Sequence, residues 1–273
     1  MGTIARYGDY RDYEHRRIET NNTMMALLAS SQIARQTLSL TLGSHLTLGQ
    51  IFPSIPHVQR FNLRSDRAQD ILSDAEQLLG VVCVPQILAI QEALVKSLLV
   101  LLAKGGSGTL PDANSATASN VHERFEGVTG ALFTKASLEL FHLLRVGRNS
   151  YIHSGGRVSP GLMSRASTLS GDAVSLWGAI SKSPLPLFAV GNPVPMGLAE
   201  LTVMLAVTKR LAEESNIWLQ IGLPRIQWIE LLRLDIRGIQ GNPEQRLRKT
   251  RGIASMHYSP LRFSEAEMMS VLV

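Results

Sequence analysis

Apolar residues recur at spacings of three and four positions along most of the chain, the period of a helix with one buried face. An early example runs from 18 to 42, with Met24, Leu27, Leu28, Ile33 and Leu38 on its apolar positions. We find no alternating strand pattern and no internal repeat, so the sequence predicts an all-α fold. The other predicted helices cover approximately residues 65–79, 85–104, 122–147, 161–181, 198–219 and 228–236, with shorter helices after 242 and 264.

Residue types typical of helix ends support these boundaries. Ser65 followed by Asp66 is typical of a helix start, and Pro85 is expected to interrupt or restart the helix that follows. Asn242 before Pro243 predicts another start. Ser264 with a glutamate three residues later has the spacing of a capping box.

We expect the chain to have three regions. Residues 1–60 are an N-terminal helical extension, 61–182 a helical core, and 183–273 a C-terminal helical region packed on that core. Residues 105–120 are rich in glycine, serine and asparagine and are expected to form a long flexible loop inside the core. Residues 181–197 contain four prolines and are expected to be an irregular connector.

Composition and charge narrow the class of protein without defining it. The 273 residues are 45% hydrophobic and 18% charged, which is ordinary for a globular protein. The net charge of +5 suits a polyanionic partner, but it equally suits a basic surface with no such role. Cys83 is the single cysteine and stands in an apolar run, so we expect no disulfide and a reducing compartment.

We also expect a soluble, cytoplasmic protein with no membrane contact. The polar N-terminus shows no secretory signal. The longest apolar stretch, residues 79–103, is interrupted by Pro85, Gln86, Gln91, Glu92 and Lys96. A membrane span needs about 20 nearly uninterrupted apolar residues.

Several kinds of site are absent from the sequence. The seven histidines are scattered and none stands at ligand spacing from another histidine or from the cysteine, so we expect no metal site. The glycines at 105–108 are not followed by the lysine of a phosphate-binding loop, and no nucleophilic serine elbow occurs. We therefore expect no cofactor.

One segment carries candidate chemistry. "LLRVGRNSYIHSGG" ends an apolar helix pattern with Arg148, Asn149 and His153, and Arg145 lies one turn earlier. An arginine offers a planar fork of donors to phosphate oxygens, and a histidine exchanges a proton near neutral pH. Together they could remove the 2′-hydroxyl proton of RNA and stabilise the phosphorane without a metal.

Two considerations oppose this interpretation. Five residues of regular helix turn through about 500°, which leaves Arg148 and His153 roughly 140° apart. They would act together if the last turn unwinds before the glycines at 155 and 156, or if a second copy completes the site. Basic residues also stabilise the C-terminus of any helix, so the motif could be only a helix end.

The same segment resembles the HEPN superfamily, whose hallmark is an arginine, four to six residues and a histidine, often with a polar residue after the arginine. Arg148, Asn149 and His153 match these positions, and the resemblance covers roughly residues 64–180. It implies a HEPN-like helical bundle with additional N- and C-terminal helices. It also implies a metal-independent endoribonuclease that dimerises to build its site and serves as a toxin, defence effector or RNA-processing enzyme.

Several other residues are secondary candidates. Glu92 could orient Arg148 or His153, or it could simply pair with Lys96 four residues later. Tyr151 could donate a hydrogen bond near a phosphate or be packed in the core. A basic run near the C-terminus could hold RNA or form a solvated helix face. Its members are Arg246, Arg248, Lys249 and Arg251.

The sequence therefore favours an endoribonuclease in which His153 is the general base or acid, Arg148 stabilises the phosphorane and Asn149 orients the phosphate. Arg145 would assist. The expected partners are RNA, a second copy of the chain, and a protein antitoxin or regulator. The alternative is a non-catalytic helical module that binds a nucleotide, an RNA or a protein.

Overall fold

The computed structural model describes residues 4–41 and 43–272, and within them 71% of the chain is helical and no strand occurs. The prediction of an all-α fold is confirmed. The α-helices are α1 (Gly8–Ser39), α2 (Leu48–Ile51), α3 (Ser65–Ser73), α4 (Ala75–Lys104), α5 (Leu110–Ser115), α6 (Val121–Thr129), α7 (Lys135–His153), α8 (Pro160–Ser167), α9 (Gly171–Ser181), α10 (Leu198–Gly222), α11 (Arg225–Asp235), α12 (Pro243–His257) and α13 (Glu265–Ser270). Two short 3₁₀ helices cover Val58–Arg60 and Ser259–Leu261.

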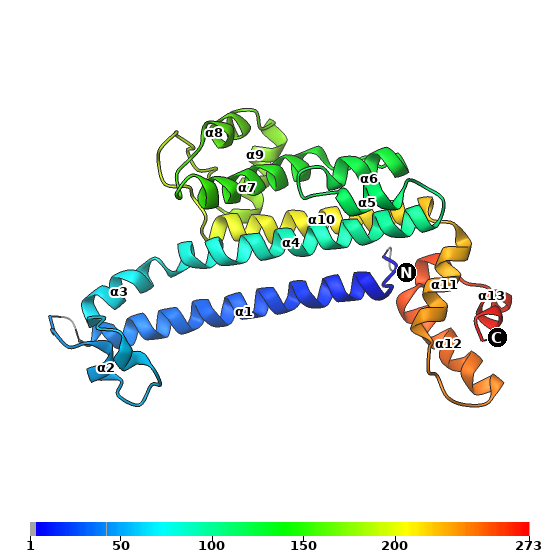
Figure 1. Ribbon diagram of the computed structural model, residues 1–273, viewed down its shortest axis with the longest axis horizontal. Coiled ribbons are helices and arrows are strands. Elements are labelled where there is room, and N and C mark those ends of the chain that lie inside the picture. Colours follow the sequence, from blue (N-terminus) through cyan, green and yellow to red (C-terminus); the bar gives the residue numbers. More distant parts are fainter. Residues whose placement is uncertain (1–3, 42, 273) are drawn as a thin grey trace.

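Helix α4 lies at the centre of the molecule. It packs against α1 on one side and against α10 and α7 on the others (Figure 1). Fourteen of its residues are buried, including Val95, Leu98 and Leu102, which have no or almost no exposed surface. A helix apolar around most of its circumference is stable only when neighbours cover it on several sides, and α4 has those neighbours.

The prediction that Pro85 interrupts this helix is wrong. Pro85 lies inside a continuous helix, and the break falls earlier, at Asp74 between α3 and α4. Ser65 is also not the cap of α3 but its first residue, after Arg64. An internal proline costs about 3 kcal/mol, and the burial of α4 against three other helices outweighs that cost.

By length and composition alone, α4 could cross a membrane. Core helices of soluble proteins meet the same criterion, and 56% of the most apolar stretch of α4 is buried against the rest of the chain. Cys83 of α4 is buried, and burial raises the pKa of its thiol, which opposes a role as a nucleophile.

The N-terminal helix begins ten residues earlier than the pattern of apolar positions predicts. The buried residues of its first turns are tyrosines, which the pattern of aliphatic residues did not include. Tyr10 and Tyr13 face the core. The backbone of Ala5, which precedes α1, exchanges two hydrogen bonds with the side-chain amide of Asn216 in α10, at 3.0 and 2.8 Å. Ala5 and the first turns of α1 therefore belong to the same core as α4 and α10.

The expected flexible loop at 105–120 is only partly a loop. Leu110–Ser115 form α5, and Thr109 caps it by accepting a hydrogen bond from the Asp112 N–H. A threonine cap followed by a proline in the first turn is a strong local signal for a helix start, and it outweighs the glycine-rich composition before it.

The predicted helix at 161–181 is two helices, α8 and α9, each capped by a serine. The connector at 182–197 is irregular, as predicted. It crosses α4 very closely at Gly80, where an added Cβ would lie 1.9 Å from the carbonyl oxygen of Met196. No residue other than glycine fits this crossing without a shift of the backbone.

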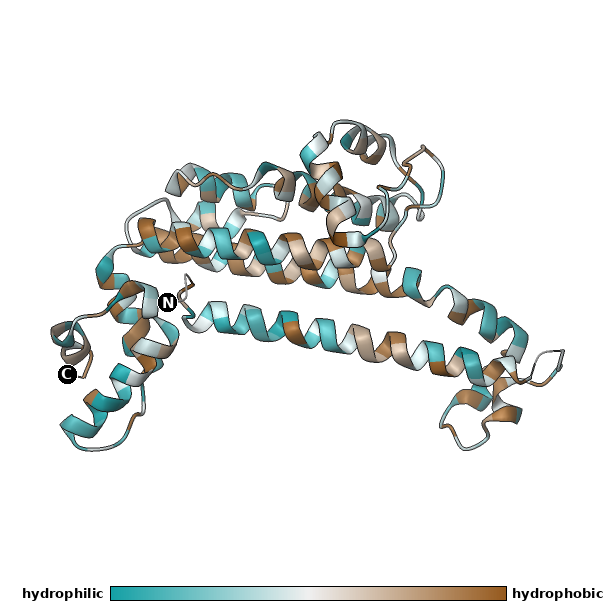
Figure 2. Ribbon diagram, turned by 180° about the vertical axis from the view of Figure 1, so that it is seen from behind, coloured by the Kyte–Doolittle hydropathy of each residue, from teal (hydrophilic) through white to brown (hydrophobic). Residues whose placement is uncertain are grey.

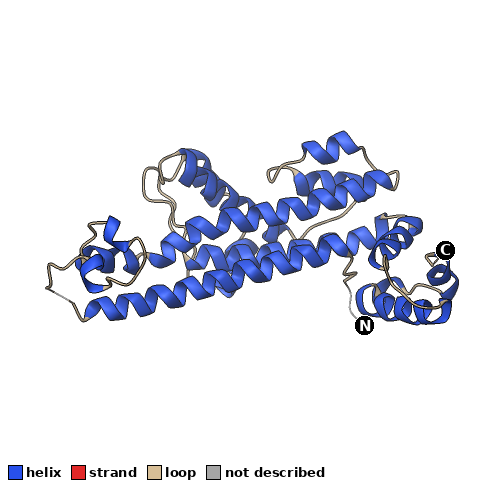
Figure 3. Ribbon diagram, turned by 60° about the horizontal axis from the view of Figure 1, so that its bottom comes forward, coloured by secondary structure: helices blue, strands red, loops and turns tan. Residues whose placement is uncertain are grey.

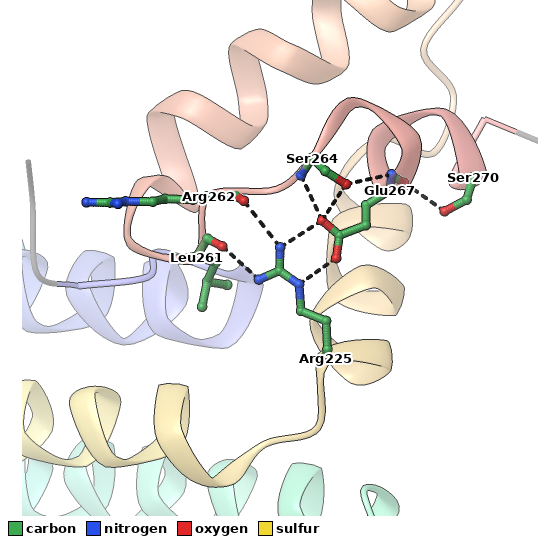
Figure 4. Close-up of polar contacts among 6 residues, drawn as sticks. All are labelled: Arg225, Leu261, Arg262, Ser264, Glu267 and Ser270. Atoms are coloured by element: carbon green, nitrogen blue, oxygen red, sulfur yellow. Dashed lines mark hydrogen bonds and ion pairs between the residues drawn. The ribbon is translucent and has the colours of Figure 1, made fainter.

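The last three α-helices form a group at the end of the molecule near the N-terminus (Figure 1). Trp228 of α11 is buried there. Arg225 and Glu267 join α11 to α13 through two short bonds, 2.6 and 2.8 Å (Figure 4). The predicted capping box at Ser264 is confirmed, and it shares the same carboxylate.

Candidate active site

Helix α7 carries the predicted motif, and its apolar face fixes the direction of its polar side chains. Leu140, Leu143, Leu144 and Gly147 are buried towards the core. The helix ends in a Schellman-type cap in which Gly155 takes a left-handed conformation and the Gly156 N–H donates to the Tyr151 carbonyl at 2.9 Å. The glycines end the helix as predicted, but only after His153.

The last turn of α7 therefore does not unwind before His153. Because the helix is regular from Arg148 to His153, the two side chains leave it roughly 140° apart. The side chain of His153 is exposed and has no hydrogen bond or ion pair within the described residues. Within one chain, the structure does not bring the predicted base and the predicted phosphate ligand together.

It does bring together the other predicted residues. A cavity of about 330 Å³ lies between α4, α7 and the loop that joins α5 to α6. Arg145, Arg148 and Asn149 line it from α7, and Glu92 lines it from α4. Two arginines and one carboxylate give the cavity a net positive charge. Thr117 and Ser119 of the loop add hydroxyl groups, which are common partners of phosphate oxygens.

Arg148 is the most unusual residue of this cavity. It is half-buried, and its Nη1 donates to the Oδ1 of the neighbouring Asn149 at 3.1 Å. Its Nε is buried and has no acceptor. A buried donor without a partner costs about 1–3 kcal/mol, and native structures contain few of them. The Nε atoms of Arg17, Arg165 and Arg246 are also buried without an acceptor, so the case for an anion depends on the two guanidinium groups that line the cavity.

Arg145 is held by residues that the sequence did not single out. Its Nε donates to Nδ1 of His142 at 3.3 Å, and Nε2 of His142 lies 3.3 Å from a carboxylate oxygen of Glu123 in α6. Burial, and then the charges of Arg145 and Arg165, lower the pKa of His142 to about 4. The ring is therefore neutral at pH 7, and its Nδ1 accepts the hydrogen bond from Arg145.

A second buried histidine lies behind this arrangement. His122 makes a 3.2 Å hydrogen bond with the side chain of Gln91 and packs edge-on against Phe133 and Phe141. Burial, reinforced by His142, lowers its pKa to about 3. His122 is a neutral core residue, and its polar contact with α4 fixes α6 beside the cavity.

Glu92 and Tyr151 were both ambiguous in the sequence. Glu92 pairs with Lys96 at 2.8 Å, as one of the two interpretations required, yet it also lines the arginine cavity. Tyr151 packs on the hydrophobic core and lies against Gly156, so it serves the end of α7. It does not line the cavity.

The C-terminal basic run lies on α12, well separated from α7 (Figure 1). Three of its members hold other parts of the chain. Arg246 donates to the Leu272 carbonyl at 2.9 Å, Lys249 donates to the Gln240 carbonyl at 2.9 Å, and Arg251 pairs with Glu265. Arg248 has no such contact among the described residues. These contacts favour a structural role for most of the run.

Within the described parts of the chain, no three histidine, cysteine, aspartate or glutamate side chains are placed to share a metal ion. Comparison with known protein families, curated proteins and solved structures finds nothing that matches this chain. The case for a function therefore depends on the cavity and on the motif in α7.

Proposed function

We propose that the chain is a metal-independent endoribonuclease of the HEPN kind, with a site that two copies build together. The observation that carries this proposal is the cavity that Arg145, Arg148 and Asn149 of the motif line together. Two arginine forks and nearby hydroxyls suit one phosphodiester, because arginine binds phosphate oxygens in pairs.

In this proposal Arg148 holds the scissile phosphate and stabilises the charge of the phosphorane. Asn149, which already orients Arg148, positions the phosphate. His153 exchanges the proton of the 2′-hydroxyl. Because the two side chains leave α7 in different directions, His153 of one copy would act beside Arg148 of the other.

A protein that binds RNA without cutting it is the second candidate. It is favoured by the separation of Arg148 and His153 along an unbroken helix. A site that needs only the cavity would bind a phosphate without His153. The RNA affinity of such a module would depend on Arg148 and would not change when His153 is substituted.

The test compares wild type, Arg148→Ala and His153→Ala on mixed RNA in the presence of EDTA. If the chain is an endoribonuclease, the wild type cleaves the RNA and both variants lose this activity. Arg210→Ala and His15→Ala are the controls, since both residues are exposed and lie on other helices. Binding by wild type and by His153→Ala, without cleavage by either, would replace the nuclease with the binding module.

A mixing experiment tests whether two copies share the site. Equal amounts of Arg148→Ala and His153→Ala chains, exchanged by mild dilution, should recover about a quarter of the wild-type activity, because random pairing leaves one intact site in half of the dimers. A mixture as inactive as its two components would show that each chain must supply both residues.

A further inference from the structure

Helix α1 has a second apolar stripe, on the side that faces away from α4. Its members follow one another at steps of four, three, four, four, three and four residues. They are Ile18, Asn22, Met25, Ala29, Ile33, Gln36 and, directly after the end of the helix, Leu40. We call this set the outer stripe of α1.

The outer stripe is straight and exposed, although Asn22 at its edge also lines a cavity between α1 and α4. At about 100° per residue, its members lie within roughly 80° of one another and nearly opposite the buried residues Tyr13, Thr20 and Met24. All seven are exposed, and the exposed fractions of its four large apolar residues lie between 50% and 86%. In Figure 3, which brings this side of the molecule forward, no other described element crosses α1.

The outer stripe is symmetric about Ala29: residues at equal distances on either side are of the same chemical type. Four residues away on either side are Met25 and Ile33, and eleven residues away are Ile18 and Leu40. The amide residues Asn22 and Gln36 stand seven residues away on either side. Each position therefore has a chemically matched counterpart at the same distance from the centre, where the smallest side chain lies.

Such symmetry is what an antiparallel pair of identical helices requires. A two-fold axis at Ala29 would place Met25 opposite Ile33, Ile18 opposite Leu40 and the two amides opposite each other. The alanines at the axis allow the helices to approach closely. An isologous contact uses the same patch on both copies, and this patch is complementary to itself.

The charges of α1 are compatible with this pairing. Arg35 is the one charged residue between 20 and 40, an unusual composition for an exposed helix. Figure 2 shows brown and pale segments between the teal ones along this helix. In an antiparallel pair centred on Ala29, Arg35 of one copy stands opposite Thr23 of the other, and Glu19 stands opposite Ser39. No like charges meet.

We propose that the outer stripe of α1 binds the outer stripe of a second copy of this chain, antiparallel and centred on Ala29. The contact is distinct from the one proposed for the nuclease. In Figure 1, α1 and α7 lie on opposite sides of α4, so pairing through α1 leaves the arginine cavity open. The proposal stands whether or not the chain cleaves RNA.

The first test adds charge to the stripe. Met25→Lys/Ile33→Lys should halve the mass of the assembly, measured by sedimentation, because each lysine would face another lysine. The wild type should have at least twice the 29.9 kDa of one chain. Leu27→Lys/Ser30→Lys adds the same charge to exposed positions of the same helix outside the stripe, and it should leave the mass unchanged.

A charge-swap mixture controls for folding. Chains with Met25→Lys/Ile33→Lys, mixed with chains carrying Met25→Glu/Ile33→Glu, should recover the larger mass. The proposal is overturned if wild type is monomeric, if the lysine variant keeps the wild-type mass, or if the mixture fails to recover it while both variants retain wild-type helicity.

The second test establishes direction, in a Cys83→Ala background under oxidising conditions. Ile18→Cys mixed with Leu40→Cys should form a disulfide between chains, and Ala29→Cys should form one with itself. Ile18→Cys alone should not, because two copies of residue 18 would stand about 33 Å apart along the helix pair. A disulfide formed by Ile18→Cys alone would indicate a parallel pair and would overturn the proposal.

Discussion

Nε of Arg145 donates a hydrogen bond to Nδ1 of His142, so a histidine that must remain neutral holds one of the two arginines of the candidate site. The ring is buried, with 6% of its side chain exposed, and its other nitrogen reaches Glu123. An acceptor at this position matters because a partly buried guanidinium without one is costly.

This arrangement predicts a loss of stability in acid. The pKa of His142 is about 4 in the folded chain, against 6.5 ordinarily, so the unfolded chain binds more protons between these values. Stability should therefore fall as the pH falls from about 6.5 to about 4. The free energy of unfolding of His142→Gln, measured by urea denaturation, should depend less on pH over this range. The glutamine amide accepts the hydrogen bond from Arg145 but does not titrate. His122 adds to the effect in both proteins.

His15→Gln serves as the control for this measurement, because His15 is exposed on α1. Its dependence on pH should equal that of wild type. An unchanged slope in His142→Gln would show that folding does not lower the pKa of His142.

Arg148→Lys separates charge from geometry at the candidate site. Lysine keeps the positive charge but lacks the planar fork, so RNA cleavage should fall by about 10²- to 10³-fold, as it does when one preorganised donor is removed from an active site. Single-turnover cleavage rates measure the loss, with Arg210→Lys as the matched change. Equal rates in wild type and Arg148→Lys would indicate that Arg148 acts only as a point charge.

Gly80→Ala should destabilise the chain although alanine favours helices. The new Cβ would meet the Met196 carbonyl oxygen at 1.9 Å, and overpacking of this kind costs about 1–3 kcal/mol or more. Gly127→Ala is the matched change, since Gly127 is exposed, helical and has no atom within 4 Å of an added Cβ. It should gain up to about 1 kcal/mol from helix propensity alone.

Thermal and urea unfolding of the two glycine variants measure both effects. A stable Gly80→Ala protein would mean that the connector and α4 can separate at this crossing without cost.

The Arg225–Glu267 pair predicts a second, more acidic transition. The hydrogen bonds from Arg225, followed by those from Ser264, lower the pKa of Glu267 from its ordinary 4.5 to about 2. A carboxylate with a lowered pKa stabilises the fold above pH 4.5 and loses that contribution as the pH falls towards 2. Glu267→Gln should therefore be less stable than wild type at pH 6, and the difference should shrink by pH 2.

Glu213→Gln is the comparison, since Glu213 is also on a helix and pairs with one lysine at 3.8 Å. Because Glu267 has 23% of its side chain exposed, solvent screening limits the size of the effect. A difference between Glu267→Gln and wild type that does not change with pH would contradict the assignment.

The helices could be predicted because their signals are local. The spacing of apolar residues, the cap at Asn242 and the capping box at Ser264 depend only on neighbours in the sequence. The errors at Pro85 and at Leu110–Ser115 have a different cause. Pro85 remains helical because helices distant in the sequence bury α4. The short helix α5 was not predicted because the glycines before it made the whole segment resemble a flexible loop.

Only part of the candidate site could be predicted, because some of its residues are distant in the sequence. Arg145, Arg148 and Asn149 are close in sequence and remain close in space. Glu123, Thr117 and Ser119 belong to other elements, and only the packing of α6 and its loop against α7 places them near the arginines. His142 stands three residues before Arg145, a spacing that could have suggested a hydrogen bond along the helix.

The position of α4, between α1 on one side and α7 on the other, has a consequence for affinity. A dimer joined through α1 would carry two arginine cavities directed away from the joint. One RNA molecule long enough to reach both would bind with avidity, because the second contact forms at a high effective concentration. Short oligonucleotides would not have this advantage, and the apparent affinity would increase abruptly at the RNA length that spans the two cavities.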